Sequence, residues 1–309
     1  IGNELNLRYT NPKVWDAVNE IAAMIHEVDP NHPTTTMFAG AGKREVEYVM
    51  ERCPEIDFLS FQIYGDIMNL PRYIKESGWT GAYVVSEWGA TGHWEVGKTE
   101  WGSPIEQNSH EKAIAYKERY EKVIASNPQQ CIGSFVFLWG QKQERTPTWY
   151  GMFLESGEDT EAVDVMQYVW TGKWPENRCP QLKSFLLNDK TSFDNVYLEP
   201  GETFEAVAIV DDPDGDTLNV SAIRTGTEGG AGTSGAVGGA LVGTYGTLTL
   251  AANGSYTYVA DQALADALAV GASASDVFTY TVSDGKGGTD TAEIVVTITG
   301  TNDDPVLSV

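Results

Sequence analysis

The sequence predicts a parallel α/β domain followed by an all-β domain, and two observations carry that prediction. The composition changes along the 309 residues: the nine tryptophans and the four histidines all lie before residue 175, whereas the later part is rich in Gly, Thr, Val, Ala and Asp. The hydrophobic pattern changes at the same place, from alternating helical and strand periods to strand periods alone. A chain of this length can bury two separate cores.

Helix and strand patterns alternate through the first domain. Residues 11–28 predict a helix because Val14, Val18, Ile21 and Ile25 recur at helical spacing. The strand segments are continuously apolar, which is typical of parallel strands covered by helices. The expected strands are 34–39, 58–64, 82–87 and 131–139, and the further expected helices are 43–53, 70–77, 109–126 and 160–171. Repeated β-α units of this kind predict a parallel sheet.

The second domain shows only strand signals. Asn253-Gly254 between two apolar runs is typical of a β-hairpin, and residues 292–298 alternate as a half-buried strand does. These signals predict an antiparallel sandwich. We place the domains at 1–177 and 193–309, joined by a linker at 178–192.

The composition also excludes some classes of partner. The formal net charge is -24, from 44 acidic and 20 basic residues, which argues against nucleic-acid binding because that depends on Lys and Arg at phosphates. We find no apolar run of the roughly 20 residues that span a bilayer, so we expect no membrane insertion. The acidic excess has two readings, a solvated surface or the binding of divalent cations.

Two glutamates stand where an enzyme built on a parallel sheet would need them. Glu87 ends the predicted strand 82–87, and Glu4 follows Ile1-Gly2-Asn3. An acid at the carboxyl end of a parallel barrel strand points into the active-site face. Cleavage of a glycosidic bond needs two such acids, one to protonate the leaving oxygen and one to attack or to activate water. The alternative reading is that each glutamate caps the helix that follows it.

In order and spacing, Asn3-Glu4, Glu87 and the strand-terminal Trp139 resemble retaining β-glycoside hydrolases of the (β/α)8-barrel clan. The stretch from Trp139 to Phe153 resembles family 2-like members of that clan. The resemblance implies an α/β fold in which residues 1–177 supply strands four to eight of a (β/α)8 TIM barrel. It also implies that Glu4 is the acid/base and Glu87 the nucleophile.

Three further residues take roles only from this resemblance. Asn3 would bind the sugar 2-hydroxyl, Tyr64 would orient the nucleophile or touch the sugar, and Trp139 would stack under it. The alternative for Tyr64 and for Trp139 is an ordinary core position. Because of their places beside Glu87 and in the loop after it, Trp88 and His93 are expected to line the cleft, with a core position for Trp88 and a solvated loop for His93 as the alternatives. The clan often has a His-x-Tyr before the nucleophile, and this chain has Gln62 in place of that histidine.

The implied activity is hydrolysis of a β-linked polysaccharide or oligosaccharide, with β-glucan favoured, by double displacement and without a catalytic cofactor. Because a barrel needs eight strands, we expect the chain to be a fragment of a longer secreted enzyme, and the fragment alone to lack activity. The alternative is a non-catalytic, calcium-binding surface or adhesion protein with a remnant barrel.

The acidic motifs of the second domain resemble the cadherin-like VCBS repeats of large bacterial surface and secreted proteins. The motifs are Asp211-Asp212-Pro213-Asp214-Gly215-Asp216, Asn253-Gly254-Ser255-Tyr256-Thr257-Tyr258, residues 278–284 and Asn302-Asp303-Asp304-Pro305. The resemblance implies further tandem repeats and an extracellular or cell-surface bacterial location. Calcium takes six to eight oxygen ligands, and we expect Asp212, Asp214, Asp216 and Asp303 to supply some of them. The alternative is a plain solvated turn.

Overall fold

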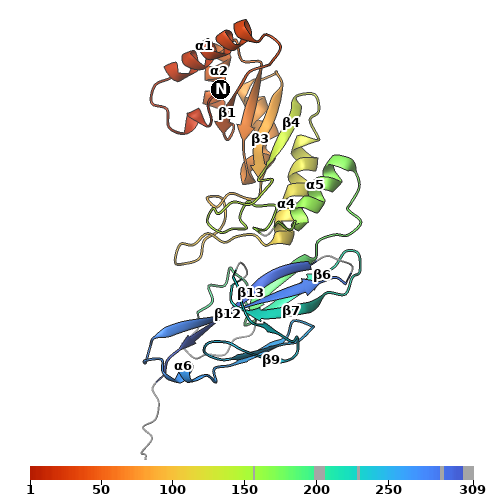
Figure 1. The fold of residues 1–309 in the computed structure, drawn as a ribbon. Helices are drawn as coiled ribbons and strands as arrows, with labels where there is room; N and C mark the ends of the chain where they lie inside the picture. The colour runs from red at the N-terminus through yellow and green to blue at the C-terminus, as the bar shows by residue number, and fades with distance from the viewer. Residues whose placement is uncertain (156, 198–205, 228–229, 286–288, 302–309) are drawn as a thin grey trace, which may run out of the picture. The chain divides into compact units, whose positions relative to one another are not determined.

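The structure, a computed structural model, describes residues 1–155, 157–197, 206–227, 230–285 and 289–301. The chain divides into two compact units, Ile1–Leu182 and Lys183–Val309 (Figure 1).

The first unit is a mixed α/β structure built on a four-stranded parallel sheet. Its strands are β1 (Thr35–Ala39), β2 (Phe58–Gln62), β3 (Tyr83–Gly89) and β4 (Cys131–Phe137), hydrogen-bonded in that order (Figure 1). The α-helices are α1 (Lys13–Val28), α2 (Lys43–Arg52), α3 (Leu70–Ser77), α4 (Ser109–Arg119) and α5 (Glu161–Thr171). Shorter turns of helix are η1 (Leu5–Leu7), η2 (Gly65–Asn69) and the π-helical η3 (Tyr120–Ile124). The parallel α/β prediction is therefore confirmed.

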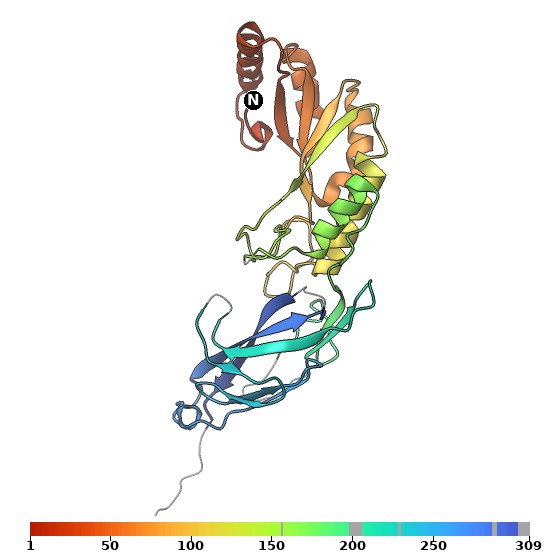
Figure 2. The ribbon, with the colours of Figure 1, turned by 45° about the vertical axis from the view of Figure 1, so that its right-hand side comes forward.

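Consecutive strand order determines where the helices lie. Each parallel strand is added next to the one before it, and right-handed crossovers then place successive helices on the same face of the sheet. In agreement, α1 packs on α2, α2 on α3 and α4 on α5, and the pair α4 and α5 lies side by side in both views (Figures 1 and 2). The sheet therefore has one helix-covered face.

An aromatic row fills the space between the sheet and the helices. Trp15 of α1 packs on Phe38, Phe38 on Phe61 and Phe61 on Tyr83, with ring centroids 5.6, 5.8 and 5.8 Å apart. All four side chains are fully buried. Because side chains alternate along a strand, the neighbours of these aromatics point to the opposite face, and the buried polar residues Ser60 and Gln62 lie there.

The strand expected to end at Glu4 does not form as a regular strand. Ile1 and Glu4 donate backbone hydrogen bonds to Thr35 and Met37 of β1, so the segment follows the edge of β1. Gly2 and Glu4 have φ of 72° and 48°, and these left-handed conformations interrupt an extended ladder. The sheet of the first unit has four paired strands and not the five expected.

The second unit is antiparallel, as predicted. Its strands are β5 (Gln181–Leu187, which begins in the first unit), β6 (Ala206–Asp211), β7 (Asn219–Thr225), β8 (Ser234–Gly235), β9 (Ala240–Val242), β10 (Thr247–Leu250), β11 (Tyr256–Val259), β12 (Ser273–Ser283) and β13 (Thr289–Thr299). They form the sheets β11-β10-β9, β13-β12-β7-β8 and β5-β6, and α6 (Ala263–Asp266) is a single turn. Leu241 and Leu248 of one sheet share a core with Ile223 and Phe278 of another. Two antiparallel sheets therefore pack on each other.

The predicted linker is partly a strand. Residues 178–192 include β5, which pairs with β6, and the boundary between the units falls at Leu182. The alternation of polar and apolar residues in Gln181–Leu187 is that of a half-buried strand. Among the described residues, every helix is too short or too polar to cross a membrane.

Candidate functional site

The candidate site lies where β2 and β3 approach their carboxyl ends. Gln62 closes β2 and is paired with Glu87 of β3 after a shift in register. The Gln62 amide Nε2 donates to Glu87 Oε1 at 2.8 Å and to Asn3 Oδ1 at 2.7 Å. Tyr64 OH donates to the other carboxylate oxygen, Oε2, at 2.9 Å. Three of the predicted site residues, Asn3, Tyr64 and Glu87, therefore belong to one hydrogen-bonded network.

Gln62 joins this network for a chemical reason. Both of its partners present oxygen acceptors, so the bridging group must donate two hydrogen bonds from one position. A primary amide has two N–H donors on one nitrogen, whereas a neutral imidazole has a single N–H. Gln62 is 4% exposed, and so its amide is fixed in this bridging orientation by the two acceptors.

Glu4 completes the acidic pair. Burial raises the pKa of Glu4, and the negative charge of Glu87 raises it further. Such an electrostatic effect requires the two carboxyl groups to be close to each other. The two carboxyl groups therefore lie within electrostatic range of each other, and their catalytic roles stay a prediction.

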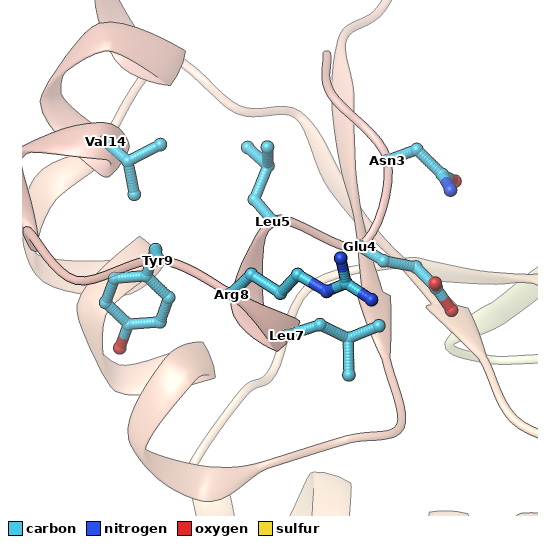
Figure 3. Close-up of a pocket in the computed structure, with 7 residues that line it drawn as sticks. All are labelled: Asn3, Glu4, Leu5, Leu7, Arg8, Tyr9 and Val14. Carbon is cyan, nitrogen blue, oxygen red and sulfur yellow. The ribbon is translucent and has the colours of Figure 1, made fainter.

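A shallow cavity opens on one side of Glu4. In Figure 3 the Arg8 side chain extends toward the Glu4 carboxylate, and the Asn3 side chain lies on the same side. The lining residues are Asn3, Glu4, Leu5, Leu7, Arg8, Tyr9 and Val14. Sequence reasoning did not single out Arg8, because its place follows from the turn η1 that reverses the chain after Glu4.

Tyr64 is enclosed by aromatic rings. Its ring centroid is 5.6 Å from Trp94, 5.6 Å from Tyr150 and 6.0 Å from Phe137, all edge-to-face. Burial and then the charge of Glu87 raise the pKa of Tyr64 far above its usual range. The phenol therefore keeps its proton at ordinary pH and acts as a hydrogen-bond donor to the carboxylate.

The predicted role of Trp88 in substrate binding is wrong. Trp88 follows Glu87 directly in β3, and successive side chains of a strand point to opposite faces. Its indole is fully buried and packs on Tyr116 and Tyr120, with centroids 5.8 and 6.0 Å away. Trp88 is therefore a core residue on the helix-covered face.

Of the two aromatic residues at the end of β4, Phe137 rather than Trp139 lies next to the network. Strand β4 ends at Phe137, two residues earlier than expected, and Phe137 contacts Tyr64. Trp139 is 53% exposed and packs on Trp170 of α5 at 5.8 Å and on Phe153 at 5.1 Å. A strand-terminal aromatic is the signal that could have identified Phe137, but Trp139 fits the same signal unless the last residue of the strand is known.

His93 lies in the loop that follows β3, at the border of this aromatic group. Its ring is 4.9 Å from Trp94 and 6.0 Å from Trp149, and its backbone N–H donates to Tyr150 OH. Its Nε2 is 3.9 Å from Glu144, a third acid that also contributes to raising the pKa of Tyr64. His93 is therefore connected to the site through Trp94, and its contact with a substrate stays a prediction.

Three of the four predicted calcium ligands, Asp212, Asp214 and Asp216, lie in a tight turn. Asp212 Oδ1 accepts the backbone N–H of Asp214 at 2.9 Å and of Asp216 at 3.2 Å, and Asp303 lies outside the described residues. Within the described part of the chain, the group whose ligand atoms converge is a different one, formed by Asp159, Asp164 and Cys179. Burial raises the pKa of Asp164 to about 6. Calcium binding at the Asp212 turn stays a prediction.

The second unit is similar to a known family of domains. Residues 188–300 match the family model of a bacterial cadherin-like domain. No curated protein matches the chain.

Several solved structures are similar to the chain. An FMN-binding β-glucuronidase from Facaelibacterium prausnitzii L2-6 is 15% identical with a TM-score of 0.42, covering 98% of this chain and 41% of its own. A GH128 exo-β-1,3-glucanase from Aureobasidium namibiae is 15% identical with a TM-score of 0.39, covering 54% of this chain and 64% of its own. An exo-β-agarase is 15% identical with a TM-score of 0.37, covering 52% of this chain and 23% of its own. The chain thus spans less than half of the β-glucuronidase.

Proposed function

We propose that the chain carries the catalytic residues of a retaining glycoside hydrolase acting on a β-linked polysaccharide or oligosaccharide. The observation that carries the proposal is the pairing of two acids in different chemical settings at one end of a parallel sheet. Glu87 accepts two hydrogen bonds, whereas burial and the charge of Glu87 raise the pKa of Glu4. Pairs of acids whose environments differ in this way supply the acid and the nucleophile of glycoside hydrolysis.

Glu87 is the proposed nucleophile. Its two oxygens are held by Gln62 and Tyr64, which fixes the direction in which the carboxylate faces. In a double displacement, one oxygen would attack the anomeric carbon and form a glycosyl ester as the bond to the leaving oxygen breaks. Tyr64 keeps its proton because its pKa is raised, and it would again donate a hydrogen bond to the Glu87 carboxylate after that ester is hydrolysed.

Glu4 is the proposed acid/base. A raised pKa keeps its proton available for the leaving oxygen, and after departure of the aglycone the same carboxylate would take a proton from the incoming water. Asn3 would bind a sugar hydroxyl next to the reacting carbon, and Phe137 replaces Trp139 as the ring proposed to stack against the sugar. No step requires a metal or another cofactor from this set of residues.

The test is hydrolysis of a panel of β-linked polysaccharides by the longer enzyme that we expect to contain this chain. Glu87→Ala should lower kcat on the order of 10³-fold or more, because it removes the covalent step. The matched control is Glu76→Gln, an exposed acid on α3 paired with Arg72, which should keep full activity. Proton NMR of the first product should show the anomeric configuration of the substrate, and an inverted product would exclude the double displacement.

The second unit favours a location outside the cell. Its match to a bacterial cadherin-like domain supports a secreted or surface-attached enzyme with further repeats of the same kind. The same match supports the alternative function, a non-catalytic adhesion protein. The two are separated by the panel, since an adhesion protein would bind surfaces or other repeats without releasing sugar.

A further inference from the structure

The carboxylate of Glu95 joins two loops beside the site. Its Oε2 accepts the backbone N–H groups of Gly65 at 2.7 Å and Gly92 at 2.8 Å, and its Oε1 accepts that of Asp66 at 3.0 Å. Gly65 and Asp66 directly follow Tyr64 in the chain. A single side chain from the loop after β3 therefore holds the backbone that carries Tyr64.

Glycine at two of the donor positions leaves room for this carboxylate and for Trp94. A Cβ atom built on Gly65 would lie 2.8 Å from Glu95 Oε2. One built on Gly92 would lie 2.6 Å from the Trp94 ring and 2.9 Å from Glu95 Oε2. A larger residue at either position would therefore displace the Glu95 carboxylate or the Trp94 ring from its present place.

A buried cation supports the loop that carries Glu95. Arg119 of α4 is 7% exposed and donates to the Gly89 carbonyl and to Thr91 Oγ1. Burial lowers the pKa of Arg119, and the negative charge of Glu95 opposes that effect. The loop from Gly89 to Glu95 is thus held at its start by Arg119 and at its end by the amides of the neighbouring loop.

Ring contacts also connect the loop of Glu95 to Tyr64. Trp94, next to Glu95, packs edge-to-face on Tyr64 at 5.6 Å, and Tyr64 OH donates to Glu87 Oε2. We propose that Glu95 is the positioning residue that holds the Tyr64 hydroxyl on the nucleophile, a role that rests on the proposed function. Glu95 itself acts through the backbone and through Tyr64.

The first test needs no catalytic activity. The chain is labelled at tyrosine Cζ, whose carbon resonance reports hydrogen bonding of the phenol, and the Tyr64 signal is assigned from its loss in Tyr64→Phe. Glu95→Gln keeps the shape of the side chain but replaces one acceptor oxygen by a donor, which cannot accept an amide. The Tyr64 resonance should move in Glu95→Gln and stay in Glu76→Gln. An unmoved Tyr64 resonance in Glu95→Gln overturns the proposal.

The second test is kinetic and uses the enzyme whose activity the polysaccharide panel establishes. Glu95→Gln should lower kcat about 10-fold with KM nearly unchanged, because it disturbs an interaction at the reacting carboxylate rather than substrate binding. Tyr64→Phe should lower kcat similarly, and the double variant should be no worse than either single one. Additive losses in the double variant overturn the proposal. Absence of hydrolysis by the wild-type enzyme would refute the proposed function, and the Tyr64 resonance would still decide the positioning role.

Discussion

At the scale of single residues, the neighbours of the Glu87 carboxylate suit its proposed role as the nucleophile. Glu87 accepts hydrogen bonds from the Gln62 amide and the Tyr64 phenol. Tyr64 does not give its proton to Glu87 at ordinary pH, because burial and the charge of Glu87 strongly raise the pKa of Tyr64, and an amide does not ionise. For Glu4, burial and the charge of Glu87 both raise the pKa. The asymmetry between the two acids is thus built by their neighbours.

The coupling between the two acids predicts the pH dependence of the reaction. A raised pKa keeps Glu4 protonated to higher pH, so turnover should be lost on the alkaline side as pH rises through that raised pKa. Glu87→Gln removes the like charge but leaves burial, the larger cause, and should move the pKa of Glu4 part of the way back toward its ordinary value. A carboxyl carbon NMR titration of Glu4 in both proteins measures this. An identical Glu4 titration in the Glu87→Gln variant would show that the two groups are too far apart to act together.

Sequence reasoning named Glu87 and Tyr64, which the structure joins by a hydrogen bond, but it misplaced two aromatic rings. Glu87 and Tyr64 were recognisable because each is a polar residue at the end of an apolar strand, where a parallel sheet presents its functional side chains. Trp88 was misplaced because the face on which a side chain lies depends on strand parity, and register shifts within β3 alter that parity. Phe137 was missed because strand ends are uncertain by a few residues from sequence alone.

At the scale of elements, the helices and strands of the first unit were predicted almost completely. The predicted helix 43–53 is α2, and the predicted strands 34–39 and 58–64 are β1 and β2 with slightly shorter bounds. Continuous apolar runs and helical spacing carry enough information for this. The edge segment before Glu4 was not predictable, because its irregular backbone follows from left-handed residues and not from hydrophobic pattern.

A buried acid holds one turn of the second unit in a way that the sequence did not indicate. Asp276 of β12 is 2% exposed. It accepts backbone N–H groups from Thr244, Tyr245 and Gly246 and the hydroxyl of Tyr258. Burial works against the charged form of Asp276, but these four hydrogen bonds outweigh it and lower the pKa.

Asp276→Asn should therefore destabilise the second unit by about 2 to 4 kcal/mol, because an amide group would face backbone donors. Since the folded-state pKa of Asp276 is lowered, its stabilising effect is present above the unfolded value and is lost as pH falls through the folded value. Calorimetry measures the change in the full chain. The tryptophans all lie in the first unit, so an unchanged tryptophan-fluorescence melt is the internal control, and an unchanged calorimetric transition for the second unit would contradict the expected role.

At the scale of the whole molecule, the main electrostatic feature is a large negative charge, part of which is concentrated in one turn of the second unit. The net charge of -24 costs self-repulsion, and four of the acids are concentrated in residues 211–216. The Asp212 side chain accepts two backbone N–H groups of this turn, and these hydrogen bonds fix the turn that carries the four acids. Hard divalent cations with oxygen ligands suit such a turn.

Calcium should therefore stabilise the second unit more than general screening does. A ligand that binds only the folded state at about 100 times its Kd adds about 2.7 kcal/mol, which should raise the Tm of this unit by about 5 °C or more. The full chain is melted by calorimetry in calcium, in a chelator, and in sodium chloride at matched ionic strength. Asp214→Asn with Asp216→Asn, which lowers the charge of the turn without removing Asp212, should abolish the difference between calcium and sodium. Equal midpoints in calcium and in sodium chloride would mean that the turn is held by its own hydrogen bonds and that its charge is only screened.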